Sequence, residues 1–279
     1  MSEAPLDALR DTAVARESDR YFAATLAPAA IRYDLVVLAA FAAELANIPL
    51  QVREPLAGEI RLQWWRDALA ANGAGTAAGH PVAVPLRAVI ARHALPAGIL
   101  DAVIDSYADT LHGDRPADEA ALAAHMAARE GGLFWLAAQI AGSDHAGDIR
   151  DVTQAAGIAY GISRTLVRLP AEGVARLPIP RSLLSDDDLD QVGTGAATPR
   201  LASAISALGH RARAALSDVV PQLAKMSRVK RLPFVPLAMV RPNLRALETW
   251  VQRGGTASIE PLPISRLLRI TWAHARGRF

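Results

Sequence analysis

The sequence contains no cysteine, which excludes disulfides, thiolate metal sites and a cysteine nucleophile. No apolar stretch reaches the roughly 18–20 residues that a membrane span requires. The longest one, at 35–46, is interrupted by Glu44 and followed by Pro49. The formal net charge is only +2 at pH 7, so we expect no nucleic-acid partner. The N-terminal segment lacks the apolar core of an export signal, which predicts a cytoplasmic protein.

What the chain does contain is alanine-rich helical sequence. Hydrophobic residues make up 51% of the 279 residues and aromatic residues only 5%. Alanine is the best helix former, and apolar residues recur at helical spacing with no convincing strand alternation. We therefore predict one all-α domain over residues 1–279. About ten helices are expected, at 6–26, 29–47, 55–72, 83–94, 97–112, 118–141, 147–169, 199–224, 234–253 and 263–276.

Two stretches carry the strongest motifs. Residues 41–69 read FAAELANIPLQVREPLAGEIRLQWWRDAL, with a Trp-Trp-Arg end, and residues 157–180 read GIAYGISRTLVRLPAEGVARLPIP. Together with HMAAREGG at 125–132, they resemble the conserved blocks of the squalene/phytoene synthase family. The resemblance implies the isoprenoid synthase fold, a bundle of helices around a central cavity.

The resemblance also implies what is missing. Family enzymes ionise allylic diphosphates with Mg²⁺ bound by aspartates on two facing helices. Aligned without gaps, those aspartates fall on Ala46, Asn47 and Leu50 in the first block and on Val167 and Ala171 in the second. Mg²⁺ is bound through carboxylates and phosphate oxygens, and these five side chains offer no carboxylate. We predict no metal site and no cofactor.

A different set of polar residues occupies the remnant of that cavity. Tyr160, Arg164 and Arg168 recur every four residues and so form one stripe on the second helix. Glu44 is the only charge in an apolar segment of the facing helix, close to Asn47. Because a buried carboxylate needs a partner, we expect Glu44 to pair with Arg164 or Arg168. The alternative is that the two arginines lie at the surface and that Glu44 reaches solvent.

Two further sets are candidate binding residues. Arg20, Tyr21 and Arg32 occupy places that in family enzymes help to meet diphosphate, so they are candidates for an anion site or for structural pairs. The charge-rich helix around the tryptophans is either a partner surface or an internal contact. That second set comprises Glu59, Arg61, Gln63, Trp64, Trp65 and Arg66.

The C-terminal part is basic. Six lysines and arginines and no acid lie between Lys225 and Arg245. In the last helix, apolar residues and Trp272 alternate with arginines, again without an acid. A basic amphipathic helix of this kind is either a membrane-surface element of region 225–279 or an ordinary packing helix. We keep open a peripheral location at the inner membrane.

These observations lead to three hypotheses for function. The first is a non-catalytic family member that helps to assemble a membrane complex or binds an isoprenoid-like molecule. A divergent branch, typified by an assembly factor for mitochondrial respiratory complex I, shows the same loss. The second is an active head-to-head prenyl diphosphate transferase, with Mg²⁺ bound by Glu44 and Asn47 facing the Asp101, Asp105 and Asp109 stripe. The third is a lipid or quinone carrier with a cavity lined by 35–45 and 133–140.

Overall fold

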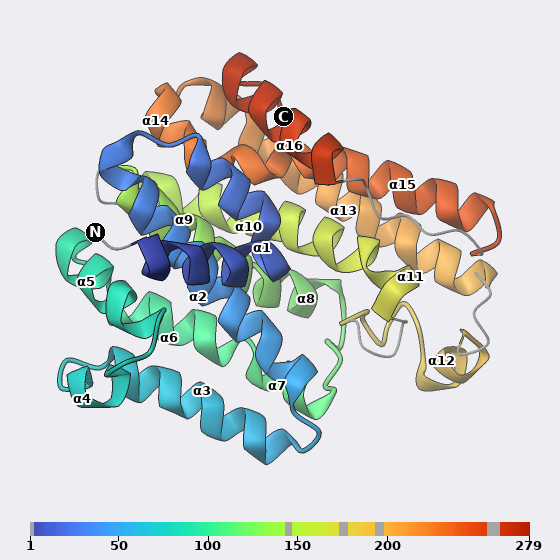
Figure 1. Cartoon of the computed structure of the whole chain (residues 1–279). Helices are drawn as coiled ribbons and strands as arrows, with labels where there is room; N and C mark the ends of the chain where they lie inside the picture. Colours follow the sequence, from blue (N-terminus) through green and yellow to red (C-terminus); the bar gives the residue numbers. More distant parts are fainter. Residues whose placement is uncertain (1–2, 143–146, 173–177, 193–197, 256–262) are drawn as a thin grey trace.

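The protein is all-α. The computed structural model describes residues 3–142, 147–172, 178–192, 198–255 and 263–279, and every regular element in these ranges is a helix (Figure 1). Eleven of the α-helices have eight or more residues, which confirms the predicted bundle of about ten. The remaining elements are short helices that the periodicity did not reveal.

Seven helices lie within residues 3–112, a stretch that the structure describes in full. The helix α1 (Glu3–Thr25) packs along α2 (Ala29–Gln51), which is followed by α3 (Pro55–Leu69). Shorter helices then cover α2 and α3 on one side of the molecule (Figure 1). They are α4 (Ala74–Ala77), α5 (Ala83–His93), α6 (Ala97–Asp105) and α7 (Ala108–His112). The helix predicted at 97–112 is thus two helices, separated at Ser106 and Tyr107.

The middle of the chain forms one nearly continuous helical rod and a long inner helix. The rod consists of α8 (Glu119–Met126), the π-helix η1 (Ala127–Gly131) and α9 (Gly132–Ile140). It packs against α10 (Gly147–Val167). A π-helical turn widens the helix locally and changes which residues face inward. That turn places Arg129 and Glu130 next to the candidate site described below.

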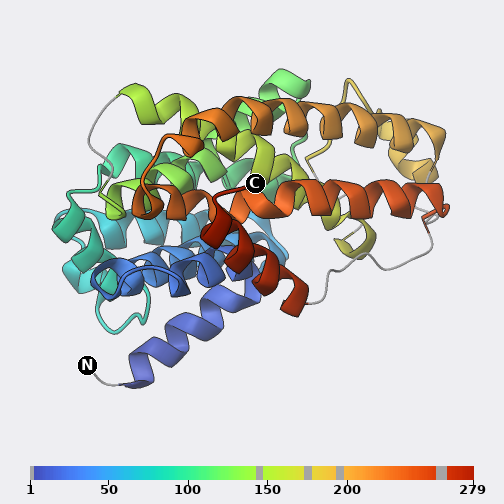
Figure 2. The same ribbon diagram turned by 90° about the horizontal axis from the view of Figure 1, so that it is seen from above.

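The C-terminal half covers α10 from the other side. The helices α13 (Pro199–Ala224) and α15 (Val240–Gln252) lie along α10 and along each other (Figure 2). The final helix α16 crosses over α1 and the 3₁₀ helix η3. The other elements of this half are α11 (Leu169–Glu172), α12 (Asp186–Val192), α14 (Arg228–Arg231), η3 (Leu232–Met239) and α16 (Pro263–Arg276).

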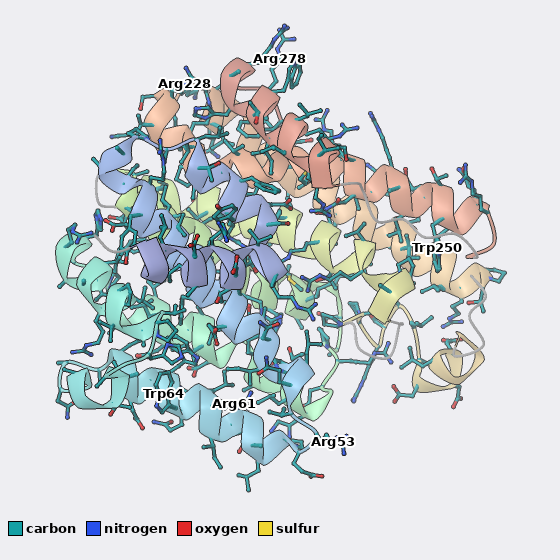
Figure 3. The ribbon with its side chains drawn as sticks, in the orientation of Figure 1. Arg53, Arg61, Trp64, Arg228, Trp250 and Arg278 are labelled. Carbon is teal, nitrogen blue, oxygen red and sulfur yellow. The ribbon has the colours of Figure 1, made fainter. Side chains whose placement is uncertain are left out.

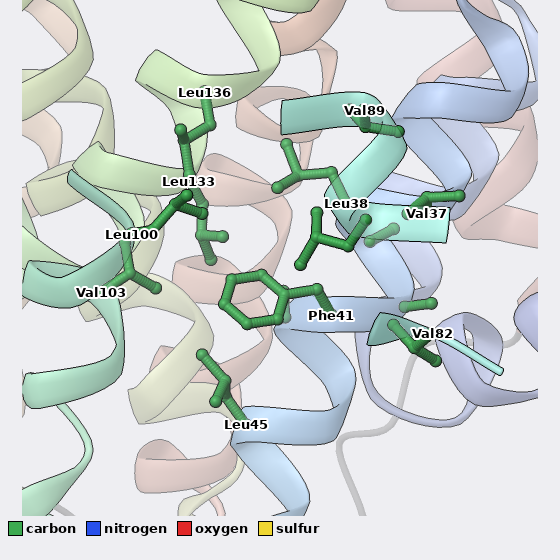
Figure 4. Packing of buried hydrophobic residues seen from close by; sticks show 14 of the residues in the cluster. Val37, Leu38, Phe41, Leu45, Val82, Val89, Leu100, Val103, Leu133 and Leu136 are labelled. Carbon is green, nitrogen blue, oxygen red and sulfur yellow. The ribbon is translucent and has the colours of Figure 1, made fainter. Parts of the chain in front are cut away.

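The core is built around α2, α9 and α10. In α2, every residue from Asp34 to Ala43 is buried, as expected for a helix that is apolar on all sides. Phe41 lies at the centre of the cluster on this side, packed among leucines and valines of α2, α5, α6 and α9 (Figure 4). A second cluster joins α10 to α13 and α15. Trp135 of α9 packs against both clusters.

The acidic stretch after Ser185 has the composition of a solvated loop, yet Asp186, Asp187 and Asp188 form the first turn of α12. The Ser185 hydroxyl accepts a hydrogen bond from the Asp188 amide, and the Asp188 carboxylate accepts one from the Ser185 amide. Reciprocal capping and the favourable helix dipole explain why three acids begin a helix. Residues 193–197 lie outside the described part of the chain.

Candidate functional site

Four charged side chains form a closed ring of ion pairs in the middle of the bundle. Arg20 donates to Glu17 and to Glu130, each at 2.6 Å. Arg164 lies 2.5 Å from the other Glu17 oxygen and 3.3 Å from the other Glu130 oxygen. At least seven-eighths of each side chain is removed from solvent. We call Glu17, Arg20, Glu130 and Arg164 the buried ion-pair network. Its two carboxylates and two guanidinium groups sum to zero charge.

Local backbone irregularities bring the network together. The helix α1 is kinked at Glu17, whose φ of −122° and ψ of 36° are not helical. Next to the kink, the Arg16 carbonyl accepts a 2.6 Å hydrogen bond from Arg164. Glu130 belongs to the π-helix η1, whose Gly131 meets Gly157 of α10 backbone to backbone. The kink and the close approach of η1 to α10 place three helices within ion-pair distance.

The network stays charged in spite of its burial. Burial alone would raise the pKa of Glu130, but Arg20 and Arg164 outweigh it and lower that pKa to about 2. Burial would likewise lower the pKa of Arg20 and of Arg164, and the two glutamates outweigh it and raise both values. The ion pairs therefore stabilise these charges in place of the water that they lose on burial.

Tyr160 connects this network to the C-terminal helix. The Arg20 guanidinium lies 5.1 Å from the centre of the Tyr160 ring, and the Arg164 guanidinium lies 5.8 Å from it. The Tyr160 hydroxyl donates a 3.1 Å hydrogen bond to Asp19, which is also bound by Arg266 of α16 at 2.8 Å. Burial, with the Asp19 charge, raises the pKa of Tyr160, so the phenol remains protonated.

A pocket of about 470 Å³ opens beside the network. Its apolar wall comes largely from the end of α2, from α7 and from Met126 of α8, and its charged lining includes Arg129, Glu130, Arg164 and Arg168. In all, four arginines and two acids line the pocket, so its lining carries an excess of positive charge. The further lining residues include Ala46, Pro49, Leu50, Val52, Tyr107, Leu111, Asp114, Arg115, Met126 and Pro178.

Some of the residues predicted to line a remnant cavity line this pocket, and others lie elsewhere. Arg164 and Arg168 line the pocket, as do Ala46 and Leu50, two of the positions where aspartates were expected. Glu44 pairs with neither arginine. Glu44 lies near His80 instead. Burial lowers the pKa of His80, and the Glu44 charge opposes that shift only in part. The predicted Glu44–Arg164 or Glu44–Arg168 pair is therefore wrong.

Asn47 and Tyr160 also lie away from the pocket lining. Asn47 accepts a 3.1 Å hydrogen bond from Arg16, and Tyr160 is enclosed in the core. The partners that sequence reasoning missed are Glu17 and Glu130. A signal existed for Glu130, an acid in a largely apolar helical stretch that precedes two glycines permitting close helix packing. Glu17 stands in a charged stretch at 16–20, so its burial had no such signal.

The predicted anion-binding residues are engaged in structural contacts. Arg20 belongs to the network, and Arg32 donates two hydrogen bonds to the Ala27 carbonyl, at 2.9 and 3.1 Å. Tyr21 is partly buried against the neighbouring Phe22 ring. The pocket lining contains none of the three. They support the fold around the start of α2 and do not converge on one site.

The residues proposed as a partner surface mostly make contacts within the protein. Trp65 is buried against Phe41, and Trp64 packs on Trp65 and His80. The polar members of this set bond to neighbours: Glu59 to His112, Arg61 to Gln51, Gln63 to Asp67 and Arg66 to Asp105. The apolar residues that α3 exposes are Leu56 and Ile60, which the sequence-based set omitted. Trp64 and Arg61 mark this outer edge in Figure 3.

The carrier hypothesis placed the cavity in the wrong part of the bundle. Leu35 to Ala43 and most of 133–140 belong to the packed hydrophobic clusters. Neither stretch lines the pocket. Among the described residues, no helix is both long and apolar enough to cross a membrane.

A profile of the squalene/phytoene synthase family matches residues 14–253 of the chain. The chain belongs to the squalene/phytoene synthase family. A solved structure, the squalene synthase HpnC from Alicyclobacillus acidocaldarius, superposes with a TM-score of 0.71 at 16% identity. The match covers 89% of this chain and 95% of that one, which establishes the isoprenoid synthase fold. No curated protein sequence matches the chain.

The family resemblance implies Mg²⁺, and the donors on this pocket do not fit it. Mg²⁺ prefers carboxylate and phosphate oxygens in near-octahedral geometry. The buried carboxylate of the pocket, Glu130, has both oxygens occupied by arginines. In the Asp101, Asp105 and Asp109 stripe, Asp105 instead binds Arg66, and Asp109 lies on a separate helix. In the described ranges, no three His, Asp or Glu residues gather where they could bind a metal.

Proposed function

We propose that this family member is a non-catalytic binding protein, whose pocket takes a small amphiphilic anion such as an isoprenoid diphosphate without Mg²⁺. One observation carries the proposal: Glu130 is neutralised by Arg20 and Arg164 at the pocket wall. In a synthase, carboxylates on two facing helices would bind metal, and the metal would bind diphosphate. Here the arginines take up the carboxylate, and the expected aspartate positions are Ala46 and Leu50.

The composition of the pocket indicates the kind of ligand. Its volume of about 470 Å³ lies within the usual range for small-molecule sites. The apolar wall suits a hydrocarbon chain, and the surplus of arginines suits an anionic head group. Arginine binds phosphate oxygens in a planar, forked geometry. An isoprenoid carrying a phosphate or a diphosphate combines both features.

The test is isothermal titration of farnesyl thiodiphosphate, a non-ionising analogue, with Mg²⁺ and with a chelator in its place. We expect binding in both conditions with the same affinity. Ala46→Asp should weaken binding by about tenfold, because the added carboxylate has the same negative charge as the ligand. The matched control is Ala57→Asp on the exposed face of α3, which should bind as the unmodified protein does.

Two results would contradict the proposal. Binding that requires Mg²⁺ would revive the prenyltransferase alternative and direct attention to substitute carboxylates. Formation of a head-to-head condensation product from farnesyl diphosphate would establish that alternative directly.

A second candidate function is a scaffold in the assembly of a membrane complex, as the resemblance to the complex I assembly branch suggests. The supporting observation is the pair Leu56 and Ile60, exposed on the helix that carries the strongest family motif. Absence of analogue binding in both conditions would favour this function. A photo-crosslinker at Ile60 in cells should then capture one partner, whereas the same group at Val84 on α5 should not.

A further inference from the structure

The helix α16 leaves an apolar stripe on its outer side. Its inner side packs on α1 and η3 through Ile270 and Ala273, which are buried. On the other side Ile264, Leu268 and Trp272 repeat every four residues and remain 65%, 64% and 50% exposed. Leu267 lies beside them and is also exposed. A contiguous exposed stripe of large apolar side chains marks an interaction surface, unlike single exposed residues.

The surroundings of this stripe are positively charged. Arg269 and Arg276 lie on the same helix and are exposed, and the Arg276 guanidinium lies 5.5 Å from the Trp272 ring centre. The short basic helix α14 lies next to the end of α16, where Arg228 donates to His274. Arg228 and Arg278 both lie at the upper side of the molecule in Figure 3. The sequence has no acid at 219–247 and none at 261–279.

An acid beneath α16, Asp19, is already neutralised. Asp19 of α1 accepts hydrogen bonds from Arg266 and from Tyr160 and is 3% exposed. Arg266 thus fixes the inner side of α16 to the core, next to the buried ion-pair network. The helix can therefore present its outer side to a partner without leaving the fold.

We propose that the outer face of α16, together with α14, docks on an anionic lipid bilayer. Ile264, Leu268 and Trp272 would enter the boundary between head groups and acyl chains, to the depth of about 5–10 Å typical of in-plane helices. The flanking arginines would contact lipid phosphates, and the tryptophan ring suits the same interfacial layer. A bilayer fits better than a protein surface, because the charge around the stripe has one sign and lipid head groups supply the opposite one.

The test is co-sedimentation of the full-length protein with two kinds of vesicles, phosphatidylcholine alone and phosphatidylcholine with roughly one-third phosphatidylglycerol. We expect binding to the anionic vesicles that falls as salt is added, and little binding to the neutral ones. The double variant Leu268→Gln, Trp272→Gln should bind anionic vesicles at least about tenfold more weakly. Its control is Leu6→Gln, Val84→Gln, a pair of exposed apolar residues on α1 and α5 with 44% and 49% exposure.

The control pair should bind vesicles as the unmodified protein does. Equal loss in both double variants, equal binding to both kinds of vesicles, or no binding to either would overturn the proposal. The last result would assign the stripe to a protein partner.

Quenching of tryptophan fluorescence by brominated lipids gives a second measurement. Quenching seen in the unmodified protein should disappear in Trp272→Phe, and persistence of the full effect would place another part of the surface on the membrane.

Discussion

At the scale of single residues, Glu130 is the position where substitution has the clearest consequence. Glu130→Gln keeps the shape but removes the charge that Arg20 and Arg164 share. Breaking a buried ion pair from one side leaves an uncompensated charge and costs about 3–5 kcal/mol. We expect the free energy of unfolding to fall by about 3 kcal/mol, measured by urea denaturation with circular dichroism.

The matched control for this prediction is Glu59→Gln. Glu59 also forms an ion pair, with His112 at 2.7 Å, but nearly half of each side chain is exposed. Surface pairs of this type contribute less than about 1 kcal/mol. A similar decrease in the free energy of unfolding in both variants would contradict the prediction that the buried ion pairs contribute more than the exposed one.

A second residue, His125, sets the pH dependence of stability. Burial, with the nearby Arg129 charge, lowers its pKa to about 4. The Glu130 charge opposes this shift in part. The Asp109 carboxylate lies 3.7 Å from the ring, and its side chain is 66% exposed. The Nε2 atom is buried without a hydrogen-bond partner in the described part of the chain.

The direction in which stability changes with pH follows from the pKa values of His125 in the folded and the unfolded chain. An unfolded histidine titrates near 6.5, so between about pH 6.5 and pH 4 the unfolded chain binds a proton that the folded chain rejects. Stability should therefore fall as the pH drops through this window, by up to about 3 kcal/mol. His125→Gln should flatten the fall between about pH 7 and pH 4.5. An unchanged pH profile in the variant would show that His125 is not the source.

At the scale of elements, the contact between η1 and α10 depends on glycine. A Cβ atom at Gly157 would lie 2.3 Å from the Gly131 amide nitrogen and 2.6 Å from its Cα. Backbone cannot move aside as a side chain can, so Gly157→Ala should lower the free energy of unfolding by at least about 1–3 kcal/mol. Gly98→Ala in α6, where nothing lies within 4 Å, should be neutral or stabilising. Thermal unfolding of both variants separates the two cases, and equal midpoints would contradict this account.

The helices themselves were largely predictable from the sequence. Proline-led starts such as α3, α13 and α16 begin at the predicted residue, because proline at the first turn lacks only a donor that would be unpaired anyway. The break of the 97–112 helix at Ser106 and the π-turn at 127–131 were not predictable. Both depend on Arg129, which bonds Ser106 and Thr110 across two elements, and such tertiary contacts leave no periodic signal.

The sequence identified Arg164 and Arg168 as residues of the candidate site, but not the carboxylates of Glu17 and Glu130. Ala46 and Leu50 share one face of α2, whereas Glu44 lies two residues before Ala46 and so about 200° around the helix axis. Glu44 was expected to pair with Arg164 or Arg168, yet it is only partly buried and lies near His80 instead. Glu17 lies outside the matched motifs, and Glu130 lies within the block at 125–132, but nothing in the sequence placed either carboxylate opposite Arg164. Facing pairs between distant helices require the fold itself.

At the scale of the whole molecule, α9 determines whether the bundle unfolds as one unit. Its Leu136 packs in the cluster of α2, α5 and α6, while Phe134 packs in the cluster of α10, α13 and α15. Trp135 touches both. The ion-pair network adds a polar link from α1 to α10 across the same region. A helix shared by two clusters should couple them, which makes the expected single domain over residues 1–279 testable.

Unfolding by urea should therefore be one transition, with coincident curves from far-ultraviolet circular dichroism and tryptophan fluorescence. Phe134→Ala and Leu136→Ala remove side chains from opposite clusters, and each should lower the free energy of that one transition by about 2–5 kcal/mol. Both variants should shift the whole urea unfolding curve. Because α9 contributes side chains to both clusters, neither cluster can unfold without exposing the α9 side chains that pack in the other. If Phe134→Ala instead separates an early transition that leaves the fluorescence of Trp64 and Trp65 unchanged, the two clusters fold independently and the chain has two domains.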